Sequence, residues 1–161
     1  MSRRCTRTNG PFQGLQVRVQ LVREGSQSYS KPIRCPDDVV ALVQEVRVWD
    51  REVFLTLALD VRNQVLGIEV TAIGSLSSTP VCPREVFKAV LLTNADGLIF
   101  VHLHPSGCPE PSNEDKMITQ VLAKGAELLG LKVLDHIIVT RDKYFSFAEH
   151  GLVQSGARQC D

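Results

Sequence analysis

The sequence has no long apolar run. None of its 161 residues lies in a stretch that approaches the roughly 18 apolar residues a membrane-spanning helix needs. The basic start, MSRRCTRTNG, is not followed by the apolar segment of a signal peptide. We therefore expect no membrane association and a cytoplasmic location.

Paired cysteines are also missing. The five cysteines are odd in number and widely scattered, and no Cys-x-x-Cys pair occurs. Neither a disulfide framework nor a four-thiolate zinc site is expected, and reduced thiols in a reducing compartment fit this pattern best.

The chain has no net charge, because 18 lysines and arginines balance 18 acidic residues. The charges are unevenly placed, however. Residues 1–35 carry seven basic residues and one acid, a net +6, and the remainder carries eleven basic and seventeen acidic residues, a net −6. Clustered cations favour contact with nucleic acid or an acidic partner, and a polar chain end is also typical of a solvated tail. Both interpretations of this basic N-terminal arm stay open.

The chain does contain regular apolar patterns. Apolar and polar residues alternate over 15–24, which predicts a first strand within the arm. Five further β-rich runs follow, at 52–60, 65–74, 97–105, 136–140 and 144–151. The segment VRNQ between the first two of these runs predicts a hairpin.

Helical patterns lie between the strands. They extend over 36–46, from Pro83 to near Gly97, and over 112–130. Because strands and helices alternate, the predicted fold class is α/β, with a mixed sheet in a single domain. That domain is expected at 36–153, between the arm at 1–35 and a C-terminal tail at 154–161.

The stretch VHLHPSGCPEPSNED, residues 101–115, brings two of the four histidines close to an aspartate. Alternate residues of a strand point to the same face, so His102 and His104 offer two imidazoles to one point. Asp115 follows a Pro-Ser-Gly turn and opens the next helix. Two imidazoles and one carboxylate satisfy a catalytic zinc ion and leave a fourth position for water. The spacing therefore predicts an open metal site with His102, His104 and Asp115 as ligands.

The same residues also have simpler interpretations. A His-x-His pair at a strand end occurs as ordinary polar residues at the rim of a sheet. Ser112-x-x-Asp115 is typical of a helix N-cap with an acid in the first turn. A carboxylate lone pair bound to a metal is not free for a cap, so Asp115 is not expected to do both fully.

The whole string HLHPSGCPEPSNED resembles the metal-binding motif of the JAMM (MPN+) metalloproteases, His-x-His-Pro followed by Ser-x-x-Asp. It is more similar to the RadC-like branch of bacteria, in which HPSG, PxPS and a later DHI recur. The segments PREVFKAVLLTNADGLIFVHLHPSG, LDHIIVT and YFSFAEHGLV extend the likeness over roughly residues 36–153. The resemblance implies a JAB/MPN-like fold, a mixed sheet flanked by helices.

The resemblance also implies a chemistry. In this family the motif's two histidines and its aspartate hold Zn²⁺. The motif serine, Ser112, is then expected to donate a hydrogen bond to the developing oxyanion, and a glutamate acts as general base. Glu52 matches that glutamate best, with Glu69 as the alternative.

The predicted function is therefore hydrolysis of a peptide or isopeptide bond through a zinc-activated water, with a protein or peptide as substrate. One alternative is a non-catalytic MPN-like interaction module. The other is a nucleic-acid-associated RadC-like protein that uses the basic arm. Because only this arm precedes the domain, the chain resembles the short, single-domain members of the branch.

Several other residues carry expectations. Leu103 stands where the branch usually has asparagine, and it is expected to face away from the metal. Cys108 is interpreted as an ordinary loop residue, with an extra thiolate ligand or an oxidation-sensitive thiol as alternatives. His136 is expected to be a structural hydrogen-bond partner, His150 a surface or structural residue, and Trp49 a core residue.

Overall fold

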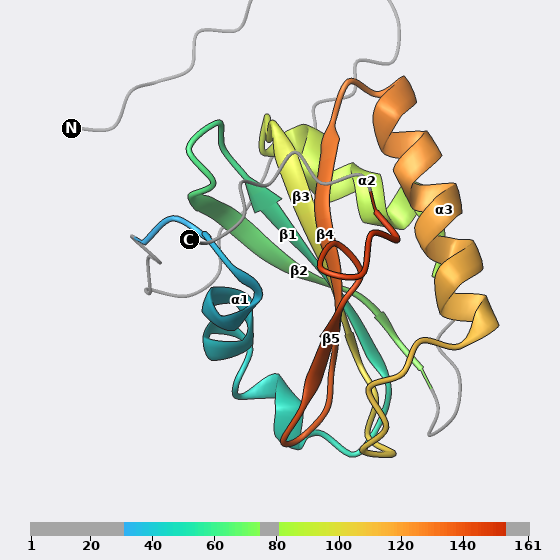
Figure 1. Ribbon diagram of the computed structural model, residues 1–161. Coiled ribbons are helices and arrows are strands. Elements are labelled where there is room, and N and C mark those ends of the chain that lie inside the picture. The colour runs from blue at the N-terminus through green and yellow to red at the C-terminus, as the bar shows by residue number, and fades with distance from the viewer. Residues whose placement is uncertain (1–30, 75–80, 154–161) are drawn as a thin grey trace, which may run out of the picture.

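The computed structural model describes residues 31–74 and 81–153 (Figure 1). The predicted strand at 15–24, most of the basic arm and the tail at 154–161 lie outside the described residues. Within them, three α-helices flank one five-stranded sheet, so the predicted α/β class with a mixed sheet in a single domain is confirmed. None of the described helices is long and apolar enough to cross a membrane.

The sheet has the strand order β2-β1-β3-β4-β5. Its strands are β1 (Val53–Leu59), β2 (Val65–Ile73), β3 (Gly97–Leu103), β4 (Lys132–Val139) and β5 (Tyr144–Ser146). β1 pairs antiparallel with β2 and β3, β3 pairs in parallel with β4, and β4 pairs antiparallel with β5. β1 and β2 form the predicted hairpin, and Asn63 adopts a left-handed φ of 59° in its turn, a conformation that asparagine tolerates.

The helices cover both faces of the sheet (Figure 1). α1 (Pro36–Leu42) packs on one face, and α2 (Pro83–Leu92) and α3 (Asn113–Leu128) pack on the other. Proline opens α1 and α2 at a position where a missing N–H leaves no bond unmade. α1 ends at Leu42 rather than at 46, and a short 3-10 turn, η1 (Val46–Val48), follows it.

The central strands β1 and β3 are buried along their whole length and divide the core in two. One set of alternate side chains packs under α1: Val53, Leu55, Leu57, Leu59, Ile99, Val101 and Leu103. The other set packs under α2 and α3: Phe54, Leu98 and Phe100. Leu103 thus points into the core under α1, away from the face of its neighbour His102, as the alternation predicted.

Three further expectations were wrong in detail. β4 begins at Lys132 rather than 136, because Gly130 ends the preceding helical turn with a φ of 70° and the strand follows at once. β5 ends at Ser146 rather than 151, and turns follow it. Trp49 is 40% exposed and not a core residue, because it lies between η1 and β1, beyond the edge of the packed layers.

Candidate metal centre

The two motif histidines meet at the end of β3. His102 is buried on the α2/α3 face, and His104 lies just past the strand, where its backbone N–H donates to the carbonyl of Val139 on β4 at 2.9 Å. This bond continues the pairing of β3 with β4 beyond the strand end. The imidazole centroids lie 4.7 Å apart at an angle of 82°, so the two rings converge, as the spacing predicted.

The loop after β3 orients His104. Gly107 turns the chain with a φ of 83°, and its N–H donates to the His104 carbonyl at 3.2 Å. The turn brings the carbonyl of Cys108 to 3.0 Å from His104 Nδ1. A hydrogen on Nδ1 satisfies this carbonyl and leaves the Nε2 lone pair for a metal, a frequent arrangement for a metal-binding histidine. Cys108 contacts His104 through its backbone carbonyl, and the residue itself is exposed.

His102 lies between two carboxylates. Its Nδ1 is 2.9 Å from Asp115 Oδ1, and its Nε2 is 3.7 Å from Glu52 Oε2. The Glu52 contact is too long for a hydrogen bond and the Asp115 contact is a close ion pair without the alignment of one, so both ring nitrogens are buried without a hydrogen-bond partner among the described residues. Burial of unpartnered polar atoms destabilises a fold, and a metal ion bound by this ring would remove part of that cost. The residues present therefore fit a metal.

Asp115 opens α3 and forms a capping box with Ser112. Its N–H donates to Ser112 Oγ at 3.0 Å, while its Oδ2 accepts from the Ser112 N–H at 2.8 Å and from the Ser112 hydroxyl at 2.6 Å. The other oxygen, Oδ1, faces His102, and Oδ2 lies 3.5 Å from His104 Nε2. The carboxylate thus caps the helix and contacts both histidines, because its two oxygens divide these contacts between them.

The electrostatics of the centre favour a cation. Burial opposes ionisation of Asp115, but its contacts with His102, His104 and the Ser112 hydroxyl outweigh burial and lower its pKa. The pKa of His104 is raised, because burial, which disfavours the charged ring, is outweighed by Asp115 and the Cys108 carbonyl. The centre therefore combines an ionised carboxylate with one ring, that of His104, which readily accepts positive charge.

Of the two candidate glutamates, the structure brings only Glu52 to the histidines. Glu52 directly precedes β1, and ligand atoms of Glu52, His102 and His104 all lie within 4.8 Å of one another. Glu69 pairs with Thr56, four positions further along β1, which corresponds to about 13 Å from Glu52. Burial raises the pKa of Glu69, and the nearest charges are on α2 rather than in the metal centre.

A second layer of hydrogen-bonded side chains supports the α3 side of the centre, and part of it could not be predicted from the sequence. The Thr119 hydroxyl donates to the Asp115 carbonyl at 2.5 Å and lies 2.6 Å from Nδ1 of His136. His136 is fully buried and stacks on Phe147 with a centroid distance of 4.6 Å. The expectation that His136 is a structural hydrogen-bond partner is confirmed. Thr119 was missed, because a threonine within a helix has no distinguishing pattern.

The match to known proteins extends over most of the chain. Residues 33–152 match a family described as the RadC-like JAB domain. A UPF0758 protein from Desulforamulus reducens is 44% identical over 151 residues, which cover 89% of this chain and 66% of that protein. A UPF0758 protein from Methanosarcina acetivorans is 47% identical over 125 residues, 77% of this chain and 55% of that protein. The chain thus spans between about half and two thirds of the length of these relatives.

Proposed function

This chain belongs to the RadC-like JAB domain family, and from that premise we propose that it is a zinc-dependent hydrolase of the JAMM type that cleaves a peptide or isopeptide bond. The observation that carries the proposal is His102. It is a buried imidazole whose two nitrogens lack hydrogen-bond partners among the described residues and face two carboxylates. A neutral imidazole in this setting is suited to hold a metal.

The proposed ligands are His102, His104 and Asp115. Catalytic zinc sites take three protein ligands from imidazole and carboxylate groups and keep a position for water. Asp115 is preferred as the third ligand because it contacts both rings, and its lowered pKa keeps it ionised. Glu52 also lies within ligand distance of the two histidines, so the experiment has to separate a ligand from a base.

A bound zinc ion would polarise the substrate carbonyl and make the attacking water more acidic. Glu52, whose Oε2 lies 3.7 Å from His102 Nε2, would accept a proton from the attacking water and pass it to the leaving amine. The Ser112 hydroxyl donates to Asp115 Oδ2 in this structure. It would have to turn toward the substrate to donate to the developing oxyanion.

The first experiment measures metal. Elemental analysis of the purified full chain should find about one zinc per wild-type molecule. A His104→Ala variant prepared identically should lose it. A wild-type protein that neither carries nor takes up zinc contradicts the proposal and favours a non-catalytic interaction module.

Two isosteric variants separate ligand from base. Glu52→Gln and Asp115→Asn each remove one negative charge and keep the shape of the side chain. Glu52→Gln should retain zinc and abolish chelator-sensitive cleavage of peptide and isopeptide substrates, whereas Asp115→Asn should lose zinc. Glu69→Gln, a matched control outside the centre, should keep both properties. Loss of zinc from Glu52→Gln with retention in Asp115→Asn would instead make Glu52 the ligand.

Nucleic-acid association through the basic arm stays a prediction, because residues 1–30 of the arm lie outside the described residues.

A further inference from the structure

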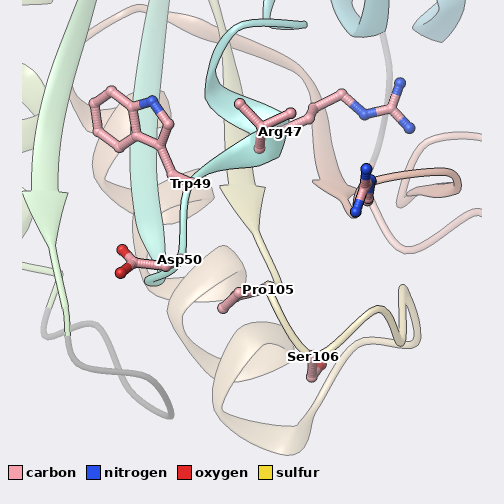
Figure 2. A pocket seen from close by; sticks show the side chains of 7 residues that line it. Arg47, Trp49, Asp50, Pro105 and Ser106 are labelled. Atoms are coloured by element: carbon pink, nitrogen blue, oxygen red, sulfur yellow. The ribbon is translucent and has the colours of Figure 1, made fainter.

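A pocket opens beside the metal centre. Its volume is about 610 Å³, in the range of small-ligand sites. Figure 2 shows Trp49 and Asp50 on the segment before β1, and Pro105 and Ser106 on the loop after β3. The lining residues are Arg47, Val48, Trp49, Asp50, Pro105, Ser106 and Arg141.

The pocket and the metal centre are neighbours in the chain at two places. Pro105 directly follows His104, and Asp50 lies two residues before Glu52. β1 and β3 pair with each other up to this point, with Val53 opposite Leu103. Two residues of chain span at most about 7 Å, so a peptide held at the centre would have the pocket within one or two residues of its scissile bond.

The cationic side of the pocket comes from two arginines. Arg47 donates through Nε to the carbonyl of Thr140 at 2.6 Å, which fixes the guanidinium at the turn between β4 and β5. Its remaining N–H groups make no hydrogen bond with the described part of the chain, and Arg141 makes no hydrogen bond or ion pair there either. Two guanidinium groups with unused donors favour a carboxylate or a phosphate.

The other walls favour the carboxylate. Asp50 also lines the pocket, where it pairs with Arg51 at 3.0 Å, and a negative charge at this position repels a phosphate dianion more than a carboxylate monoanion. Trp49 and Val48, 40% and 73% exposed, offer apolar surface for the methylene groups of a side chain. The pocket therefore combines an apolar wall with two arginines that form no ion pair in the described part of the chain, a combination that suits an acidic side chain with its methylene groups.

We propose that this pocket binds a substrate carboxylate one or two residues from the scissile bond, so that the centre selects acidic peptides. The claim that the pocket determines substrate specificity rests on the proposed hydrolase function. The binding itself does not require turnover, because the pocket lies outside the metal ligands.

Trp49 makes the binding measurable, since it is the only tryptophan of the chain and lines the pocket. Its fluorescence is followed while zinc-loaded full-length protein is titrated with two blocked hexapeptides that differ only by glutamate or glutamine. Wild type should bind the glutamate peptide at least about tenfold more tightly, the value of one charge-assisted hydrogen bond. Arg141→Gln should lose that preference. Arg62→Gln removes the same charge from the β1–β2 hairpin, at the opposite end of the sheet, and should keep it.

Each contrary outcome has one meaning. Equal binding of the two peptides, or a preference unchanged by Arg141→Gln, overturns the proposal. Tighter binding of inorganic phosphate than of the glutamate peptide overturns the choice of a carboxylate. Glutamate-selective binding without cleavage of any peptide leaves the pocket standing and removes the hydrolase. Cleavage without glutamate preference supports the hydrolase and overturns the assignment of the pocket.

Discussion

Asp135 and His136 are neighbours in β4 whose pKa values shift in opposite directions. Burial raises the pKa of Asp135 to about 6, although the Ser146 hydroxyl and the N–H groups of Ala148 and His136 donate to its carboxylate. Burial lowers the pKa of His136 to about 3, and charge on His102 lowers it further. In the folded state Asp135 therefore keeps its proton to a higher pH than usual, and His136 takes up a proton only at a lower pH than usual.

The two shifts have opposite effects on stability in acid. Unfolded His136 binds a proton below its ordinary pKa of 6.5 and folded His136 only below about 3, so its contribution to stability is present above pH 6.5 and is lost as the pH falls. Folded Asp135 binds a proton below about 6 and unfolded Asp135 below 3.8, so acid favours the folded state in that window. As the pH falls from about 6 to about 4, His136 destabilises the fold by about 2–3 kcal/mol and Asp135 stabilises it by about 2 kcal/mol, so the two effects largely cancel.

Asp135→Asn should reveal the pH dependence of the free energy of unfolding that His136 causes and that Asp135 offsets in wild type. Asparagine keeps the acceptor for the two backbone N–H groups and the shape of the side chain, but it cannot ionise. We expect the variant to lose about 2 kcal/mol relative to wild type as the pH falls from about 6 to about 4. The measurement is urea unfolding followed by circular dichroism at half-unit pH steps, with a chelator present to keep the protein metal-free.

The matched control is His136→Asn, whose free energy of unfolding should rise relative to wild type by about 2–3 kcal/mol as the pH falls through the same window. The mutation also leaves a cavity, but its cost does not depend on pH. The reasoning is refuted if the stability difference between Asp135→Asn and wild type is constant from about pH 6 to about pH 4.

Three further predictions concern α3. Ser112→Ala should lower the stability of the metal-free protein by about 1 kcal/mol through loss of the helix cap, while Ser112→Thr should keep it, as thermal unfolding can test. Gly125→Ala should destabilise the protein by about 1–3 kcal/mol in urea unfolding, although alanine has the better helix propensity, because the new Cβ would lie 2.8 Å from Phe87. In a Phe87→Leu background the same change should become neutral or stabilising. Thr119→Val removes the hydroxyl beside Nδ1 of the buried His136 and should cost about 1–3 kcal/mol in urea unfolding, and an unchanged denaturation midpoint would contradict the assigned hydrogen bonds.

The sequence predicted those parts of the fold that depend on local pattern. VRNQ marked a hairpin because its residues tolerate a turn, and Pro36 and Pro83 marked helix starts because of their fixed geometry. The beginning of β4 was missed because Asp135, directly before the predicted strand start at His136, resembles a polar break ahead of an apolar strand. Both are buried within the strand, and their partners come from distant segments that no local pattern reveals.

In the candidate site, too, the features set by local pattern could be predicted and those set by strand pairing could not. The convergence of His102 and His104 follows from strand geometry alone, and the cap at Ser112 follows from a short motif. The choice between Glu52 and Glu69 needed the pairing of β1, because alternation within one strand does not say which residue of a neighbouring strand lies opposite. The pairing puts Glu69 beside Thr56, far from the histidines.

Trp49, expected in the core, lines the exposed pocket instead, so the candidate catalytic groups and the pocket lie in structurally different parts of the domain. The candidate metal centre is formed by β3, the start of β1 and the first turn of α3, where His102 and Asp115 are held in buried positions. The pocket beside it is built from η1, the loop after β3 and the turn between β4 and β5, whose side chains contribute little to the core. Substitutions in such segments rarely destabilise a fold, whereas substitutions at buried positions often do. Exchanging Arg141 should therefore change which substrate carboxylate is accepted while the centre and the free energy of unfolding stay nearly constant, so the acidic-peptide preference is the property of this domain that a few loop substitutions can most readily alter.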